Sequence, residues 1–230
     1  MRTHPTKLAA LWLATVLLGG CDNHDGHDGP MQTQTRELSG FNAIDMEGAA
    51  RLEISVGSPY SVELEAPAEV LERVNTEIRG ETLAIESRAK DWFPSGGRAR
   101  VTLRISTPEL TSLRLGGGND VVVQGYAGGE SSIKVEGAAN IEARGELESL
   151  VVRMSGAGQA DLSELIAGRV KVTVDGVGTA VVHANDALDA TVNGSFSAKR
   201  QRRKVALLSW MPQRTRHRSE SPVRAAISGL

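Results

Sequence analysis

From residue 113 onward the sequence repeats one short pattern about every 20 residues, and this repeat constrains the fold more than any other feature. Each copy alternates apolar and polar residues over four positions and then reaches a glycine, after which small residues follow. The aligned glycines lie 20, 19, 20 and 18 residues apart and are Gly117, Gly137, Gly156, Gly176 and Gly194. A single copy is too short to bury its own apolar side, so the copies must stack on one another.

Stacking places equivalent strands side by side in parallel, about 4.8 Å apart. The sequence therefore predicts an all-β fold, namely a parallel β-solenoid or β-helix-like stack of short strands with a period of about 20 residues. One apolar column is expected to face inward, formed by Leu115, Val135, Met154, Val174 and Val192. Two columns are expected to face solvent, formed by Arg114, Lys134, Arg153, Thr173 and Thr191, and by Gly116, Glu136, Ser155, Asp175 and Asn193.

The region before the repeats shows the same period of two, which is typical of half-buried strands. We expect strands at 50–56 and 60–65, joined by a Gly-Ser-Pro turn, and further strands at 82–87 and 100–106. Only residues 67–74 look helical, for one or two turns. Aromatic residues make up only 3% of the chain, so small and β-branched side chains must form the core.

The first twenty residues are typical of an export signal, with a basic start and an apolar run that is too short to span a membrane comfortably. The run ends in Leu18-Gly19-Gly20-Cys21, which resembles the bacterial lipobox. That resemblance implies a lipoprotein signal peptide at 1–20 and lipidation of Cys21 by a diacylglycerol thioether, with a further acyl chain such as palmitate on the new amino terminus. The alternative is a lone cysteine beside an ordinary signal-peptidase site. Asp22 favours the inner membrane by the rule of enterobacterial lipoproteins.

Residues 21–35 are polar and glycine-bearing, so we expect a flexible tether. His24, Asp25, His27 and Asp28 could form a loose transition-metal site, but a solvated spacer is the favoured interpretation and no metal or cofactor is expected. The single cysteine of the chain excludes an internal disulfide framework.

Charge divides the chain near residue 198. Residues 21–198 carry 15 basic and 27 acidic residues, whereas residues 199–230 carry 9 basic and 1 acidic. We interpret 36–198 as the folded domain and 199–230 as a disordered or degenerate tail, because strand alternation and turn glycines both stop there. The alternative is a basic arm for lipopolysaccharide, anionic lipid or nucleic acid. The overall net charge of −2 argues against a general nucleic-acid binder, so no nucleic-acid partner is expected.

Several residues are candidates for chemistry or contact. Parallel β-helices can host polysaccharide lyases and glycosidases, and Glu136, Asp161 and Asp175 are the acids to test for that role. The two outward columns carry opposite charges, however, and neighbours that neutralise each other are what a solvated sheet needs in any case. His183 has no evident catalytic partner. The loop aromatics, residues 92–93, are expected to pack over the sheet rather than bind a ligand.

The ordered succession of segments resembles the bacterial family of putative auto-transporter adhesin head GIN domains. The matching segments are Phe41–Ile44 with Gly48, Leu52–Gly57, Tyr60–Leu64, Gly80–Ile85 and the repeated Gly-x-Gly corners, covering about residues 36–197. The resemblance implies a secreted or envelope-tethered β-solenoid and implies no reaction, ligand or catalytic residue.

These observations together predict an adhesin-like binding or structural module, held in the bacterial envelope by its lipid and facing the periplasm. Its expected partners are an envelope glycan, peptidoglycan or another envelope protein. The alternative from a different class is a carbohydrate-active β-helix enzyme, and a third is a signalling or scaffold role at the inner membrane.

Overall fold

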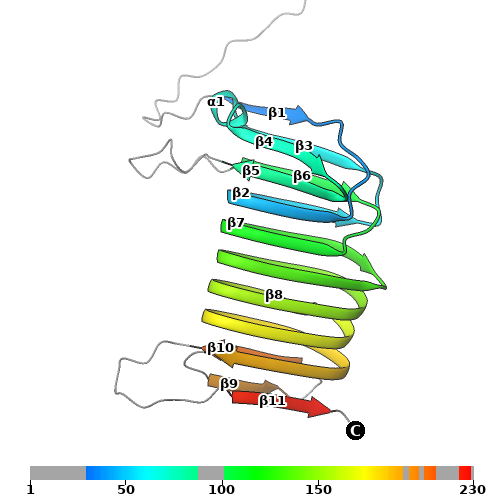
Figure 1. The fold of residues 1–230 in the computed structure, drawn as a ribbon, viewed down its shortest axis with the longest axis vertical. Helices are drawn as coiled ribbons and strands as arrows, with labels where there is room; N and C mark the ends of the chain where they lie inside the picture. Colours follow the sequence, from blue (N-terminus) through cyan, green and yellow to red (C-terminus); the bar gives the residue numbers. More distant parts are fainter. Residues whose placement is uncertain (1–29, 88–100, 194–196, 202–204, 211–222, 229–230) are drawn as a thin grey trace, which may run out of the picture.

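The computed structural model describes residues 30–87, 101–193, 197–201, 205–210 and 223–228, and these are almost entirely strand. Figure 1 shows them as a tall stack, with the start of the described chain at one end and the last strand at the other. The strands are β1 (Met31–Thr35), β2 (Ala43–Val56), β3 (Ser61–Pro67), β4 (Val74–Arg79), β5 (Thr82–Ser87), β6 (Val101–Thr107), β7 (Ser112–Ala127), β8 (Glu130–Asn193), β9 (Ser197–Gln201), β10 (Val205–Trp210) and β11 (Val223–Ser228). One short helix, α1 (Ala68–Leu71), lies between β3 and β4.

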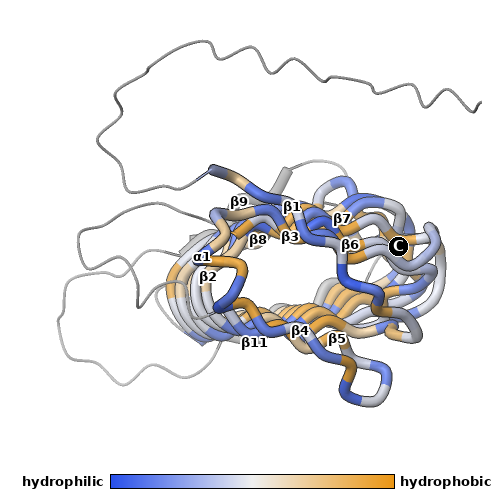
Figure 2. The backbone as a smooth tube through the Cα atoms, turned by 90° about the horizontal axis from the view of Figure 1, so that it is seen from above, coloured by the Kyte–Doolittle hydropathy of each residue, from blue (hydrophilic) through white to orange (hydrophobic). Residues whose placement is uncertain are grey.

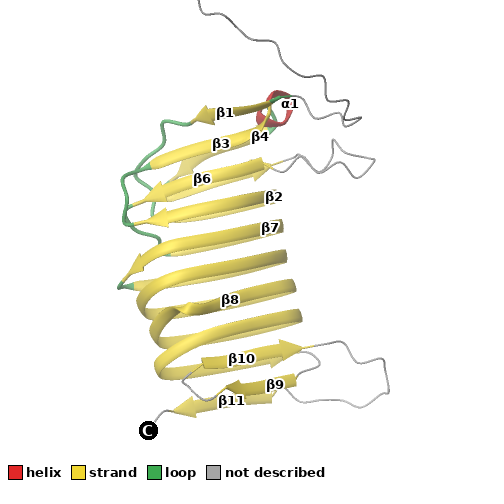
Figure 3. Ribbon diagram, turned by 180° about the vertical axis from the view of Figure 1, so that it is seen from behind, coloured by secondary structure: helices red, strands yellow, loops and turns green. Residues whose placement is uncertain are grey.

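These strands form one curled sheet that mixes parallel and antiparallel pairs. Its order is β1-β3-β6-β2-β7-β8-β10-β9, with β4, β5 and β11 attached beside this path. Pairing is parallel in the middle, where β2 lies against β5, β6 and β7, and β7 lies against β8. It becomes antiparallel towards both ends, at β1, β3 and β4 and at β9, β10 and β11 (Figure 3).

The register of the parallel strands follows the glycine repeat. Residue 113 of β7 lies opposite residue 133 of β8, twenty positions later in the chain. A methyl group built on Gly137 would overlap the carbonyl oxygen of Gly117, and the same relation joins Gly156 to Gly137 and Gly176 to Gly156. Four of the five aligned glycines therefore lie on one another in order, as the repeat predicts, while Gly194 is outside the described residues.

The apolar column expected to face inward is buried. Leu115, Val135, Met154, Val174 and Val192 are each between 1% and 7% exposed. Figure 2 shows the hydrophobic positions along the inside of the curled backbone and the hydrophilic positions along the outside. Fully burying a side chain of this size contributes roughly 1.5–3 kcal/mol, so the columns supply the main driving force for the stack.

The order of the first strands could not be read from the sequence. A turn joins β2 to β3, as expected, but the two do not pair with each other. Instead β6, which comes more than 40 residues after β2, lies between them, parallel to β2 and antiparallel to β3. The helical turn expected within 67–74 is present as α1, whose Val70 and Leu71 are buried against the core.

Two segments differ from the sequence-based expectation. The tether was expected to extend to residue 35, but its last five residues form β1, because Met31–Thr35 pairs along its whole length with β3. Parts of the tail also form strands: β10 and β11 pair with β8, and β9 pairs with β10. Backbone hydrogen bonding to an open strand edge requires no side-chain alternation, which is why the composition of the tail did not indicate these strands. The domain boundary at residue 198 stays a prediction.

Candidate functional site

The candidate site is a long outer surface on β2, β7 and β8, which we call the ladder face. Its positions alternate with the buried column, so parallel pairing stacks them strand over strand. The ladder face comprises Asp45, Glu47, Arg114, Gly116, Lys134, Glu136, Arg153, Ser155, Thr173, Asp175, Thr191 and Asn193.

Ion pairs cross the ladder face between strands. Arg114 of β7 donates through Nη2 to the Glu136 carboxylate of β8 at 2.8 Å, and its Nε lies 3.9 Å from the Asp45 carboxylate of β2. Lys134 shares the same Glu136 carboxylate at 3.0 Å. The structure thus confirms that the outward columns neutralise one another here. These side chains are substantially exposed, so each pair contributes little to stability and mainly fixes the position of its charges.

This environment decides the chemistry open to Glu136. The hydrogen bond from Lys134, helped by the nearby Arg114 charge, lowers the pKa of the Glu136 carboxyl below its ordinary value. A general acid for glycoside cleavage needs the opposite shift, which keeps the carboxyl protonated near neutral pH. Glu136 is therefore a poor proton donor and a good fixed acceptor.

The other two acid candidates are also held by neighbours. Asp175 accepts a hydrogen bond from the Asn193 amide at 2.5 Å, and the two residues are 18 positions apart in β8. Asp161 accepts from the Ser163 hydroxyl at 2.6 Å and from the Ser163 backbone N–H at 3.1 Å. The contacts of the three acids differ, and no hydrogen bond or ion pair among the described residues joins one acid to another.

Arg153 is the ladder-face cation that the described residues leave without an ion pair. It is exposed, and the register places it between Lys134 on one side and Thr173 on the other. A guanidinium offers several donors in a fixed plane and suits carboxylates, phosphates and sugar hydroxyls. Arg153 is therefore the ladder-face residue best placed to contact a ligand.

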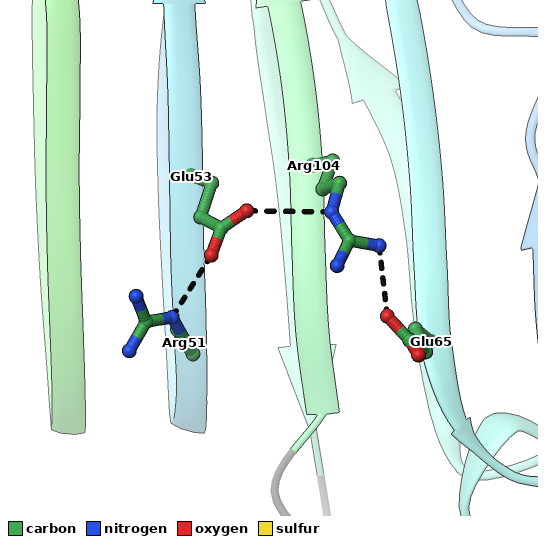
Figure 4. A network of polar contacts seen from close by, with 4 residues as sticks. All are labelled: Arg51, Glu53, Glu65 and Arg104. Atoms are coloured by element: carbon green, nitrogen blue, oxygen red, sulfur yellow. Dashed lines mark hydrogen bonds and ion pairs between the residues drawn. The ribbon is translucent and has the colours of Figure 1, made fainter. Parts of the chain in front are cut away.

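A second polar network lies where β6 is inserted (Figure 4). Arg104 of β6 contacts Glu53 of β2 at 3.3 Å and Glu65 of β3 at 2.8 Å, and Glu53 also accepts from Arg51 at 3.0 Å. The hydrogen bond with Glu65 raises the pKa of the Arg104 guanidinium. The sequence shows the alternating polar positions of these strands but not the order of the three strands in the sheet. Sequence reasoning therefore missed this network.

The remaining predicted residues take no part in a built site. His183 is half-buried near the end of β8. In the described part of the chain, no three His, Cys, Asp or Glu side chains are grouped to hold a metal ion. The same part contains no helix with the length and apolarity needed to cross a bilayer. Cys21, the four residues of the proposed metal site (24, 25, 27 and 28) and the aromatic pair at 92–93 lie outside the described residues.

Solved structures of bacterial proteins share the fold. The chain superposes on a crystal structure of a "putative adhesin" from Bacteroides fragilis with a TM-score of 0.53 and 16% identity, covering 72% of this chain and 86% of that one. A "putative adhesin" from Parabacteroides distasonis gives a TM-score of 0.52 and 17% identity, covering 66% of this chain and 64% of that one. At such identities the likeness concerns the fold alone.

No curated protein matches the sequence. The model of one protein family does match, over residues 40–199, and these residues span β2 to the start of the tail. The chain therefore belongs to the family described as "Putative auto-transporter adhesin, head GIN domain".

Proposed function

We propose that the protein is an adhesin-like binding module of the bacterial envelope, built as a parallel β-solenoid and carrying its ligand on the ladder face. The observation that supports this most is the shape of the polar surface: outward groups recur from strand to strand along the stack, with charges fixed by ion pairs. A surface of this kind matches an extended polymer with repeating groups better than a small substrate. Membership of a family named for an adhesin head points the same way.

The proposal includes a lipid anchor on Cys21 and no catalytic activity. The lipobox-like sequence before Cys21 supports the anchor, and the start of β1 only ten residues later would keep the sheet close to the membrane. Two or three acyl chains hold a protein on a bilayer stably, since each buried methylene contributes about 0.8 kcal/mol. The absence of catalysis is inferred from the hydrogen bonds and ion pairs that hold Glu136, Asp161 and Asp175 in separate environments.

The ligand class that we propose is an envelope glycan, including peptidoglycan, with another envelope protein as the remaining possibility. Arg153 would donate to a sugar hydroxyl or carboxylate, and the ladder-face hydroxyls such as that of Thr173 would add weaker hydrogen bonds. Such contacts are individually weak, so affinity would come from several neighbouring strands binding consecutive sugars.

The test uses the detergent-solubilised full-length protein on an array of bacterial polysaccharides and peptidoglycan fragments, with release of reducing sugar measured in parallel. We expect binding without release. Arg153→Glu should reduce binding at least tenfold, whereas Arg169→Glu should leave it unchanged, since Arg169 is an exposed β8 arginine outside the ladder face. Release of sugar that is abolished by Glu136→Gln, Asp161→Asn or Asp175→Asn would contradict the proposal and support a carbohydrate-active enzyme.

A further inference from the structure

The outermost strand at the first end of the stack, β1, has one free edge. In the described part of the chain its only strand partner is β3, along a continuous register from residue 31 to residue 35. Met31 is 54% exposed, which is the largest exposure of any big apolar side chain that the structure describes. A row of unpaired backbone N–H and C=O groups can template pairing with another strand.

The hydrogen-bond pattern shows which residues face this free edge. The N–H of Arg36 donates to the Val62 carbonyl at 2.8 Å, and the register continues this pair to Gln34 opposite Leu64. In an antiparallel ladder alternate residues bond to the partner strand, so Gln32 and Gln34 bond to β3. The N–H and C=O groups of Met31, Thr33 and Thr35 therefore point away from the sheet.

The sequence and register of β1 itself lack the features that usually protect an edge strand. Natural edges carry charged side chains, an internal proline or a bulge. The other strand with a single partner at this end of the stack, β4, carries Glu77 and Arg79, and Arg79 is also ion-paired to Glu86 of β5. In contrast, Met31–Thr35 reads MQTQT, with no charge and no proline, and its register with β3 has no break.

The sequence of β1 is also suited to pairing with itself. Around Thr33 it reads the same in both directions, with Gln32 on one side and Gln34 on the other. We propose that β1 of one molecule pairs antiparallel with β1 of a second copy, with Thr33 opposite Thr33 of that copy. Met31 then lies opposite Thr35 of the other molecule. This arrangement brings every outward-facing N–H and C=O of the two strands into register, and directly opposed threonines are a favourable cross-strand pair.

A five-residue edge is small compared with the roughly 1,200 Å² or more that stable interfaces bury, so the pairing is weak between freely diffusing molecules. Restriction to a membrane raises the effective concentration of the copies. Met31 lies ten positions after Cys21, a reach of at most about 36 Å, so the β1 edges of tethered copies would all lie within this distance of the membrane surface. This last step depends on the proposed anchor, whereas the edge geometry does not.

The test is disulfide crosslinking of the full-length protein in isolated membranes under mild oxidation. Thr33→Cys should give a crosslinked dimer, because residues directly opposed in an antiparallel pair have Cα atoms about 5.5 Å apart, within disulfide range. Thr35→Cys is the matched control: its two copies would be offset by about 13 Å along the strands and should not crosslink. A mixture of Met31→Cys and Thr35→Cys chains should crosslink to each other.

Thr33→Pro provides the blocking variant. It removes an N–H that points to the free edge and none that bonds to β3, so thermal unfolding should match the parent protein. When Thr33→Pro is introduced as a second substitution into both the Met31→Cys and the Thr35→Cys chains, the crosslinked fraction should fall at least fivefold. Crosslinking of Thr33→Cys no stronger than that of Thr35→Cys, or a fraction unaffected by Thr33→Pro, would overturn the proposal.

The anchor has a separate readout in the same experiment. Protein missing from the membrane fraction would show that the anchor is absent, and the edge would then be tested by crosslinking the purified protein at high concentration. Crosslinking of the parent protein, which has no added cysteine, would reveal a free Cys21 thiol rather than β1 pairing.

Discussion

Val174 and Thr173 are adjacent in β8 but meet opposite environments, and this pair tests the register directly. Val174 is 1% exposed within the apolar column, whereas Thr173 lies on the ladder face. Val174→Asp should cost at least about 3 kcal/mol of unfolding free energy because it buries an unpaired charge, and Thr173→Asp should change it by less than about 0.5 kcal/mol. Urea unfolding measures both. Equal destabilisation by the two variants would contradict the register.

Tyr126 makes stability depend on alkaline pH. It is buried with its hydroxyl 3.3 Å from that of Ser131, and burial raises the pKa of the Tyr126 phenol to about 12. The unfolded chain loses this proton near pH 10 while the folded protein retains it, so the unfolded state is favoured progressively as pH rises from 10 to 12. The contribution amounts to about 1.4 kcal/mol of lost stability per pH unit in that interval.

Tyr126→Phe removes this titration while keeping the ring. Its unfolding free energy should therefore fall less between pH 9 and pH 11 than that of the parent protein, as measured by urea unfolding at both pH values. Because every other titrating group is shared by the two proteins, the difference isolates Tyr126. An identical loss in both would show that the phenol is not buried in the folded state.

Among the structural elements, the glycine column determines how closely successive strands approach. Gly117 has a φ of +86°, and a methyl group there would overlap the Gly48 carbonyl oxygen of β2, whereas a methyl group on Gly118 has no atom within 4 Å. Gly117→Ala should therefore cost more than about 2 kcal/mol through backbone strain and overlap, and Gly118→Ala should be nearly neutral. Thermal unfolding of both variants checks this. A neutral Gly117→Ala would contradict the close stacking at the corner.

The same elements show what the sequence can and cannot reveal. Alternation with a period of two identified strands within β2, β3, β5, β6, β7 and β8 and their buried positions, because burial of one face selects apolar residues there, as at Val135 and Val174. Strand order depends on contacts between distant segments, so the insertion of β6 between β2 and β3 left no local signal. The Arg104 network depends on that order and was missed with it, whereas the pairing of Arg114 with Glu136 followed from the repeat.

At the scale of the whole molecule, the proposed anchor on Cys21 would determine where the stack is located. Cys21→Ser should move the protein from the membrane fraction to the soluble fraction, because the thioether requires sulfur. Metabolic labelling with a palmitate analogue, followed by fractionation, measures both lipid and location. Asp22→Ser serves as the control, since it leaves the sulfur in place. Labelling that persists in Cys21→Ser would exclude Cys21 as the lipid site.

The other end of the molecule raises the question of how the stack is closed. Two segments in the last part of β8, residues 178–183 and residues 187–192, would otherwise each have an edge without a partner strand. β10 pairs with the first segment and β11 pairs with the second. Both strands run antiparallel to β8, so they interrupt the parallel order that would otherwise invite another strand. The terminal units of repeat proteins commonly need such a cap.

Truncation after Ala198 should then expose both edges. We expect the melting temperature to fall by about 5 °C or more, which corresponds to the loss of roughly 2 kcal/mol in a protein of this size, together with self-association that increases with concentration. Thermal unfolding and light scattering of the full-length and truncated proteins measure the two effects. Limited proteolysis supplies the independent check, because strands paired with β8 should resist cleavage. A tail that is cleaved at once, with an unchanged melting temperature after truncation, would show instead that residues 199–230 are the dispensable tail that their composition predicts.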